Sequence, residues 1–454
     1  MNRLFYSLLL YLLSPIIGIY FIYRGFHAHG YWKNWSERLG LVPREIIESR
    51  SKNSNCIHLH CASVGEVKAA IPLLKALLNH YPQSLLLITT NTPTGREELQ
   101  KFANEINSSP FTNKGALIIR RIAICYLPID WPSACRRFIN RVKPTLSLFM
   151  ETELWPNLID HLSHRNITSM LVNARMSDRS MKNYTNFPAI SRPMFQSLNH
   201  VAAQFESDKI NLISLGCHKE KISLIGSVKF DINISAQLKE EQKQIKQSWC
   251  GGSDKNKDRP CWIAASIHPA EFEIILNTHA KLLSLFPNLL LIAVPRHPEK
   301  FTELKSICNK KNITFVNRSE KIVPSKDHSV VIGDTMGELM LLFGVANIAF
   351  MGGSLIERGG HNPIEPVACG LPVIMGNSDY NFSDVCKILQ LSGVLNRVDG
   401  ECQLVESIEN LLSDRKLLKQ KSEACCRIVQ ENEGPIDRLL KVIEAYFRLH
   451  AKPL

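Results

Sequence analysis

The sequence predicts an α/β protein with two doubly wound domains of parallel strands. Short apolar runs such as 57–60 alternate with amphipathic helical stretches such as 65–81, and this order is typical of a parallel sheet covered by helices on both faces. The stretch 235–260 is charged and poor in apolar residues, which indicates a helix and an exposed loop between two domains. The 454 residues are 45% hydrophobic, so the chain is long enough for two cores.

The first element is an apolar N-terminal segment, residues 4–23, which contains no charged side chain. Its length matches a hydrocarbon core of roughly 30 Å, whereas a cleaved signal peptide has a shorter apolar stretch. Lys and Arg side chains are more frequent after the segment than before it, so the positive-inside rule predicts that the following body lies in the cytoplasm. We expect residues 1–25 to form a membrane-anchor helix. Because Pro15 interrupts the segment, a helix lying partly in one leaflet is an alternative to a full span.

Composition narrows the choice of partner and compartment only slightly. The 54 Lys and Arg side chains exceed the 42 Asp and Glu side chains, giving a net charge of +12 at pH 7, which permits nucleic acid, anionic lipid or a small anionic substrate. The 13 cysteines are scattered and show no C-x-x-C pair, so we expect a reducing compartment and neither disulfides nor structural zinc. The chain has no G-x-G-x-x-G or P-loop motif, which disfavours a dinucleotide site or a triphosphatase.

The alternation of strands and helices predicts the domain boundaries. We expect the anchor at 1–25, a first domain at 40–235, a second domain at 255–430 and a C-terminal helix at 431–454, with a return of that helix to the first domain as one option. Ligands of doubly wound domains bind at the carboxyl ends of the strands. We therefore look for chemistry in the loops that follow the strands.

Three of these loops share one pattern, an N-cap residue followed three positions later by a glutamate. The pairs are Ser63 with Glu66, Thr335 with Glu338, and Asn362 with Glu365, where Pro363 suits the first helical position. A capping box alone explains each pair. The alternative is functional, because free N–H groups at a helix N-terminus also suit a phosphate.

Two further loops of the second domain have features of a nucleotide site. Arg296 and His297 directly follow an apolar run, where the guanidinium can hold a phosphate through two hydrogen bonds; a solvated loop is the alternative. Another apolar run is followed by glycines that let the backbone approach a ligand closely, namely Gly352, Gly353, Gly359 and Gly360.

The first domain offers charged side chains after its later strands. Glu151 and Glu153 follow one strand, and we interpret Glu153 as a first-turn glutamate that stabilises a helix. Lys229 stands near the end of the domain, where we expect it to face the ligand site. A third group forms either a solvated face or a patch for acceptor phosphate or membrane: Arg175, Arg179 and Lys182.

Beyond these local patterns, a series of motifs runs in order along nearly the whole chain: SVGE, TPTG, ETELWPN, NAR, GSVKFD, PRHP, GDTMGEL and GGSLIERGGHNPIEP. The series resembles the Kdo transferases, membrane-anchored glycosyltransferases that move 3-deoxy-D-manno-octulosonic acid (Kdo) from CMP-Kdo to a lipid A precursor. The resemblance implies a GT-B fold, in which two Rossmann-like domains face a cleft, and inversion at the anomeric carbon. Stretches 107–122 and 251–259 look longer than the family pattern and are expected to be surface insertions.

The resemblance also implies roles for individual residues. It makes Glu66 the general base and gives Glu151 and Lys229 the task of stabilising the transition state. It places CMP on two residues after one strand, Pro295 and Arg296, and on two further loops: Met336, Gly337 and Glu338, then Asn362, Pro363, Ile364 and Glu365.

The expected partners are CMP-Kdo, the lipid A precursor lipid IVA and the inner leaflet of the cell inner membrane, with the catalytic body on the cytoplasmic side. No cofactor, metal ion or nucleic acid is expected. Two alternatives stay open. One is a different GT-B enzyme that uses a nucleotide sugar, such as a UDP-sugar transferase or 2-epimerase. The other is a membrane-tethered nucleotide-sugar binding protein in which every glutamate is only a helix cap.

Overall fold

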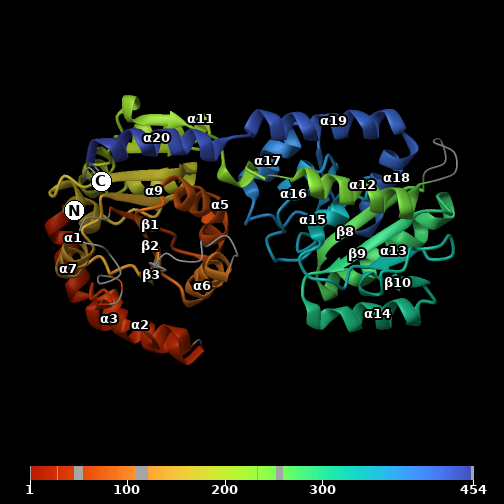
Figure 1. Ribbon diagram of the computed structural model, residues 1–454, viewed down its shortest axis with the longest axis horizontal. Helices are drawn as coiled ribbons and strands as arrows, with labels where there is room; N and C mark the ends of the chain where they lie inside the picture. The colour runs from red at the N-terminus through yellow and green to blue at the C-terminus, as the bar shows by residue number, and fades with distance from the viewer. Residues whose placement is uncertain are drawn as a thin grey trace. The chain divides into compact units, whose positions relative to one another are not determined.

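The computed structural model divides the chain into two compact units (Figure 1). Unit 1 comprises Met1–Asp231 and Gly434–Leu454, and unit 2 comprises Ile232–Glu433. The structure describes every residue except 1, 28, 45, 47–54, 109–120, 233, 252–258 and 451–454. The two expected insertions, 107–122 and 251–259, therefore lie largely outside the described residues.

Unit 1 is built on a parallel sheet of seven described strands in the order β3-β2-β1-β4-β5-β6-β7. The strands are β1 (Cys56–His60), β2 (Leu85–Thr90), β3 (Ile122–Tyr126), β4 (Leu146–Met150), β5 (Thr168–Ala174), β6 (His200–Ala203) and β7 (Ile222–Leu224). The strands β1, β2, β4 and β5 are buried along their whole length, as expected where helices cover both faces. The chain changes direction between β1 and β4, so ligands are expected at their carboxyl ends.

Helices cover both faces of this sheet and create two cores. One face packs against α7 (Pro132–Val142), α8 (Pro156–Ser163), α10 (Pro188–Gln196) and α11 (Glu206–Ser214). The other packs against α5 (Val64–His80), α6 (Pro93–Ser108) and α20 (Pro435–His450), while α9 (Asp178–Thr185) follows β5. The C-terminal α20 belongs to unit 1 because Leu439, Ile443 and Phe447 are buried in the second core, and because Arg438 Nε donates to Ile225 O at 2.9 Å.

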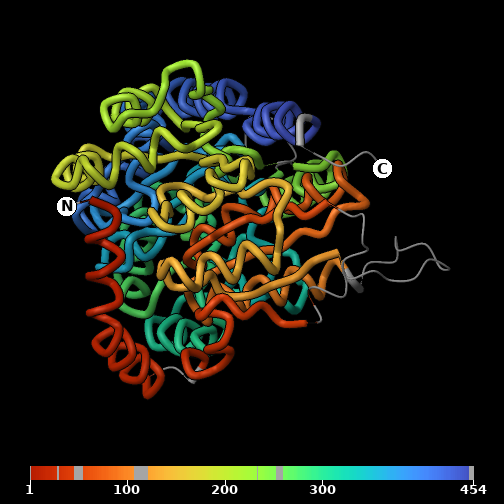
Figure 2. Tube along the Cα trace, turned by 90° about the vertical axis from the view of Figure 1, so that its left-hand side faces the viewer, coloured from red at the N-terminus to blue at the C-terminus, as the bar shows by residue number. Residues whose placement is uncertain are grey.

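The apolar N-terminal segment forms two helices, α1 (Arg3–Leu12) and α2 (Ser14–His27), which are bent by 55° at their junction (Figure 2). Pro15 has no N–H to continue the hydrogen-bond ladder of α1, which explains the break. In the described part of the chain, no single helix is long and apolar enough to cross a membrane, and the bent pair meets that test only by length and composition. The single anchor helix that we expected is therefore replaced by a bent pair. The helix α3 (Trp35–Arg38) follows it.

Unit 2 repeats the doubly wound plan with the strand order β10-β11-β9-β8-β12-β13-β14. The strands are β8 (Cys261–Ile267), β9 (Leu290–Pro295), β10 (Phe315–Asn317), β11 (Val330–Ile332), β12 (Ile348–Met351), β13 (Val373–Met375) and β14 (Leu395–Arg397). Their helices are α12 (Ala236–Cys250), α13 (Pro269–Leu285), α14 (Phe301–Lys310), α15 (Leu339–Phe343), α16 (Ile364–Ala368), α17 (Ser383–Leu391), α18 (Glu401–Ser413) and α19 (Arg415–Asn432). The prediction of two parallel-sheet α/β domains is confirmed. The central strands β8, β9 and β12 have their carboxyl ends at the switch point of this sheet.

Candidate functional site

Glu66 lies in the first turn of α5, directly after β1, and its carboxylate is held by two hydrogen bonds. Ser63 is the N-cap of α5, and its Oγ accepts from the Glu66 N–H at 3.4 Å. Glu66 Oε2 accepts from the Ala62 N–H at 2.9 Å, and Oε1 accepts from the Ser63 hydroxyl at 2.9 Å. The capping interaction predicted from the sequence is therefore present, although the carboxylate reaches back to Ala62 rather than to the N-cap N–H.

The same carboxyl group has a perturbed proton affinity. The pKa of Glu66 is raised to about 7, mainly by burial and further by the charges of Glu153 and Glu151, although the two hydrogen bonds lower it. A carboxyl group with a pKa near the working pH suits a general base, because it is ionised often enough and is basic enough to accept a proton. Glu66 is thus both a cap and a chemically unusual carboxylate.

Glu151 and Lys229 form a partly buried pair beside Glu66. Lys229 Nζ lies 3.7 Å from Glu151 Oε1. Glu151 directly follows β4 and has a φ of +53°, a left-handed conformation that is unfavourable for a side chain with a Cβ. Its N–H donates to Val172 O of β5 at 3.0 Å. Strained backbone of this kind is concentrated at functional sites, and here it places a carboxylate at the switch point of the sheet.

Glu153 belongs to the same group, so our interpretation of it as a helix-stabilising first-turn residue is wrong. The following helix, α8, begins only at Pro156. Burial raises the pKa of Glu153, and the charge of Glu151 raises it further. The signal for this lay in the sequence, because a proline favours the first position of a helix and Pro156 therefore marks the helix start.

The turn that carries Lys229 is fixed by the end of β5. Lys229 is the central residue of a 3₁₀ turn, Val228–Phe230. Asn173 Oδ1 accepts from the Val228 N–H at 3.1 Å, and Asn173 O accepts from Gln204 Nε2 at 2.9 Å. Asn173 also has a positive φ of +50°. The asparagine of the NAR motif thus links the lysine turn to the central sheet.

In unit 2, the loop Met336–Glu338 follows β11 and is held by an arginine that sequence reasoning missed. Arg318 Nε and Nη2 donate to the two oxygens of Glu338 at 3.1 and 3.0 Å, and the Thr335 hydroxyl also donates to this carboxylate. Burial alone would raise the pKa of Glu338, but these hydrogen bonds outweigh it and lower the pKa. The predicted capping box at 335–338 is wrong, because α15 begins at Leu339 with Glu338 as its N-cap.

The loop Asn362–Glu365 lies after β12, and the charge of Arg296, which follows β9, acts on it. Asn362 Oδ1 accepts from the Ile364 N–H at 3.1 Å, and its Nδ2 donates to Glu365 Oε1 at 3.0 Å. Pro363 is the N-cap of α16, one residue before the position that we predicted for it. Burial raises the pKa of Glu365, although the Asn362 hydrogen bond and the charge of Arg296 lower it. Arg296 and Glu365, predicted to share the nucleotide, thus lie within electrostatic reach.

Pro295 and Arg296 occupy the expected place. Pro295 is the last residue of β9, and the Arg296 N–H donates to Ile267 O of β8 at 2.9 Å. The predicted site residues therefore fall into two sets. Unit 1 contributes Glu66, Glu151 and Lys229, and unit 2 contributes the three loops at the carboxyl ends of β9, β11 and β12.

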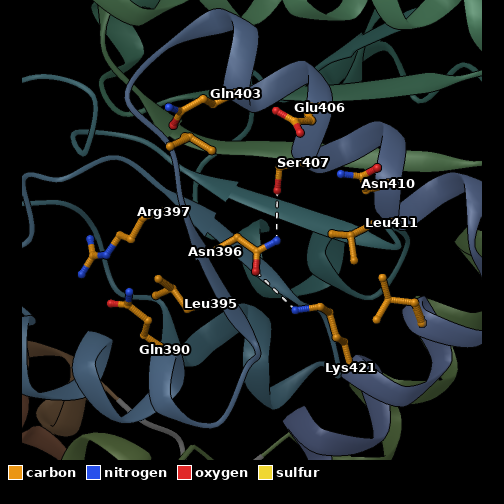
Figure 3. A pocket seen from close by; sticks show the side chains of 12 residues that line it. Gln390, Leu395, Asn396, Arg397, Gln403, Glu406, Ser407, Asn410, Leu411 and Lys421 are labelled. Atoms are coloured by element: carbon orange, nitrogen blue, oxygen red, sulfur yellow. Dashed lines mark hydrogen bonds between the residues drawn. The ribbon is translucent and has the colours of Figure 1, made fainter.

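A cavity of about 630 Å³ lies elsewhere in unit 2, beside β14 (Figure 3). None of the residues predicted to bind CMP lines it. Its two cations are already engaged, since Arg397 Nη1 donates to Gly376 O at 2.7 Å and Lys421 Nζ donates to Asn396 Oδ1 at 3.3 Å. We therefore do not assign the nucleotide to this cavity.

Comparison with known proteins identifies the family of the chain. The family model described as "3-Deoxy-D-manno-octulosonic-acid transferase (kdotransferase)" matches residues 33–232, and the model "Glycosyl transferases group 1" matches residues 309–425. A glycosyltransferase structure from Rickettsia africae is 15% identical, with a TM-score of 0.50 over 87% of this chain and 98% of that chain. At this identity the likeness shows a shared fold alone.

Two sequence relatives cover the chain almost completely. The 3-deoxy-D-manno-octulosonic acid transferase of Haemophilus influenzae is 37% identical over 98% of this chain and 99% of its own length. The enzyme of the same name from Bordetella pertussis is 29% identical over 98% of this chain and 99% of its own length. The chain therefore belongs to the family of 3-deoxy-D-manno-octulosonic acid (Kdo) transferases and is a glycosyltransferase.

Proposed function

We propose that this Kdo transferase moves Kdo from CMP-Kdo to a sugar hydroxyl of the lipid A precursor lipid IVA, with inversion at the anomeric carbon. The observation that carries the proposal is the group formed by Glu66, Glu151 and Lys229, in which a carboxyl group with a pKa of about 7 lies near a charged pair. CMP-Kdo brings its own leaving group. The protein must therefore orient the hydroxyl, accept its proton and stabilise the departing phosphate.

Glu66 is proposed as the base. The acceptor hydroxyl is a very weak acid, so it gives up its proton late, as its oxygen bonds to the anomeric carbon. The proton passes to the Glu66 carboxylate, and CMP leaves with the electrons of the broken bond. The hydrogen bonds from Ala62 and Ser63 hold the carboxylate in one orientation, which favours transfer because the base needs no reorganisation.

Lys229 is proposed to supply positive charge where the departing phosphate develops negative charge. A preorganised charge of this kind lowers the barrier because it is already oriented before the reaction begins. Glu151 would hold the ammonium group in place through the contact of 3.7 Å.

CMP is proposed to bind unit 2 through Pro295 and Arg296, Met336–Glu338 and Asn362–Glu365. The support is local order. Arg318 fixes the second loop through Glu338, and Asn362 fixes the third loop through Ile364 and Glu365. The guanidinium of Arg296 suits the single phosphate of a CMP-sugar.

A direct assay tests this function. The full chain is incubated with CMP-Kdo, with and without lipid IVA, and both free CMP and Kdo-modified lipid are measured. We expect acceptor-dependent CMP release with an equal amount of modified lipid. Turnover of a UDP-sugar in place of CMP-Kdo would contradict the proposal.

We further propose that α1 and α2 lie along the cytoplasmic leaflet of the inner membrane. One side of α1 holds unit 1, because Arg3 Nη1 lies 2.5 Å from Asp160 Oδ2, and the Tyr6 hydroxyl donates to Asp130 Oδ2 at 3.1 Å. Apolar side chains of α1 are exposed, including Leu8 at 66% and Leu12 at 74%. A helix with a bonded polar side and an exposed apolar side suits the plane of an interface.

Vesicle flotation tests this placement. The wild-type chain should float with vesicles of anionic phospholipid, and the double variant Leu8→Asp, Leu12→Asp should stay in the soluble fraction with unchanged melting temperature. Gln244→Asp on α12 is the control for an added charge. Equal flotation of wild type and the double variant would contradict the placement.

A further inference from the structure

Three histidines gather at the carboxyl ends of the central strands of unit 2, and no role assigned above uses them. His268 follows β8, His297 follows β9 and His361 follows β12. The rings of His268 and His361 are stacked, with centroids 5.3 Å apart and planes 11° apart, and their Nε2 atoms are 3.0 Å apart. The His297 ring lies 5.7 Å from that of His268. The three strands are neighbours, so the cluster lies at the switch point where ligands bind.

Positive charge converges on this cluster. Burial lowers the pKa of His268, and the charges of His297, Arg358 and Arg296 lower it further. Arg358 and Arg296, from the loops after β12 and β9, thus act on the His268 ring. A bound anion would offset this repulsion.

The neighbouring carboxylates are already engaged by the protein. Glu271 is fully buried and accepts backbone N–H groups from His268 at 3.0 Å, Gly353 at 2.9 Å and Leu355 at 3.2 Å. Glu365 is bonded by Asn362. Glu271 thus fixes the loops that carry the histidines through backbone N–H groups.

Gly353 keeps the backbone beside the pair free of side-chain atoms. Its φ is +70°, and a Cβ built on it would lie 3.2 Å from His361 Nε2 and 3.4 Å from Arg358 Cβ. A side chain at this position would be strained and would crowd the ring. The glycine therefore keeps side-chain atoms away from the His361 ring.

We propose that His268 and His361, together with Arg358, form a subsite for the carboxylate of the donor sugar. The inference rests on the proposed function, because it assumes that CMP-Kdo is the donor. That molecule carries two anionic groups, the phosphate of CMP and the carboxylate of the octulosonic acid. Arg296 and the loops 336–338 and 362–365 are assigned to CMP, so the sugar carboxylate needs donors of its own. Imidazole N–H groups and a guanidinium are suitable donors for a carboxylate.

The subsite makes the donor pocket selective for an acidic sugar. A hydrogen bond to a charged group strengthens binding more than one between neutral groups, and leaving such a donor without its partner carries a penalty. The protein should therefore bind CMP-Kdo more tightly than a CMP-sugar in which the carboxylate is replaced by a neutral carboxamide.

The experiment distinguishes binding of the sugar from binding of the nucleotide. KM for CMP-Kdo and the inhibition constant of CMP are measured on the full chain with saturating lipid acceptor, for wild type, His268→Gln, His361→Gln and Arg358→Gln. We expect KM to rise about 10-fold or more, as for the loss of a hydrogen bond to a charged group, while the inhibition constant of CMP changes by less than about 2-fold. His328→Gln is the matched control, since that ring bonds Ser325 away from the strand ends.

Each outcome decides the proposal. A parallel rise of KM and of the CMP inhibition constant would assign the histidines to the nucleotide and overturn the subsite. Unchanged KM in all three variants would also overturn it. If a histidine variant does not fold, as shown by the loss of its melting transition, the kinetic constants of Arg358→Gln decide the proposal. The Arg358 side chain is exposed, so its replacement should leave the fold intact. Wild type that transfers no Kdo from CMP-Kdo would instead overturn the proposed function, so the two failures are distinguishable.

Discussion

The ammonium group of Lys229 lies 3.7 Å from the carboxylate of Glu151, and both side chains are about one-fifth exposed, at 20% and 19%. The two residues come from different strand ends, since Glu151 follows β4 and the Lys229 turn follows β7. A charge pair at the surface would contribute little to stability. Because the pair lies at the switch point of the sheet, we propose that it acts on a ligand.

Lys229→Gln should therefore lower kcat more than it lowers stability. We expect a decrease of about 10²-fold or more, the usual effect of removing a preorganised electrostatic group, with a small change in melting temperature. Steady-state kinetics with CMP-Kdo and lipid acceptor measure this. Lys209→Gln is the control, because Lys209 pairs with Glu206 at 3.2 Å on α11. Equal kcat values for the two variants would remove Lys229 from the mechanism.

The pKa of Glu66 predicts the pH dependence of catalysis. Because the base must be ionised and its pKa is about 7, kcat/KM should rise with pH through a midpoint near that value and then level off. The profile of Glu66→Gln should lack this midpoint. A wild-type profile that is flat between about pH 5.5 and 8.5 would contradict the assignment.

The same pKa predicts a change in stability with pH. The folded pKa of Glu66, about 7, lies above the ordinary value of 4.5, so the folded state holds a proton that the unfolded state has lost between these two values. The free energy of unfolding therefore falls as pH rises through this window. Glu66→Gln carries no such proton. Its melting temperature relative to wild type should be higher at about pH 8 than at about pH 5, and an equal difference at both would contradict the prediction.

Arg318→Gln tests how the Met336–Glu338 loop is held. Without the two hydrogen bonds from Arg318 to Glu338, the loop loses its fixed shape. Both KM for CMP-Kdo and the inhibition constant of CMP should rise, by about 10-fold. Lys300→Gln, which breaks an exposed pair with Glu303, should change neither constant. Unchanged CMP inhibition in Arg318→Gln would separate this loop from the nucleotide.

Transfer should not require a divalent metal ion. CMP-Kdo has one phosphate to neutralise, and two acidic side chains near the donor loops, Asp334 and Glu338, are paired with cations. Lys305 Nζ lies 2.9 Å from Asp334 Oδ2, and Arg318 pairs with Glu338. EDTA should therefore leave the rate of Kdo transfer unchanged. Loss of transfer with EDTA and its recovery with magnesium would show that the phosphate is bound differently.

The fold was predictable from local patterns because the central strands are buried on both faces. β9 and β12, for example, consist only of apolar residues, and most of the described strands are followed by a helix. Glu66 could also be found from the sequence, because its cap with Ser63 is a pattern within four residues. Residue types at such short spacing are visible in a sequence.

The remaining site features depend on distant contacts and were missed. Arg318 and Glu338 are separated by 20 positions, and His268 and His361 by 93. Such pairs cannot be predicted from a local sequence pattern, because the residues meet only through the order of the strands in the sheet. Glu153 was misassigned for a local reason, since α8 begins later than we predicted.

The central claim is that Glu66 accepts the proton of the acceptor hydroxyl, and Glu66→Gln tests it most directly. Glutamine can keep both contacts, with its oxygen accepting from Ala62 and its amide donating to Ser63, so the cap is retained. Ser63→Ala is the comparison, because it removes the cap and one hydrogen bond to the carboxylate but keeps the base. It should lower stability by about 1 kcal/mol and lower kcat far less than Glu66→Gln does.

The decisive measurement is kcat of Glu66→Gln with saturating CMP-Kdo and lipid acceptor, beside the inhibition constant of CMP. We predict that kcat falls by about 10²- to 10⁴-fold, the usual contribution of a general base, while CMP inhibition stays near the wild-type value. A kcat close to wild type would contradict the account and leave Glu66 as a helix cap.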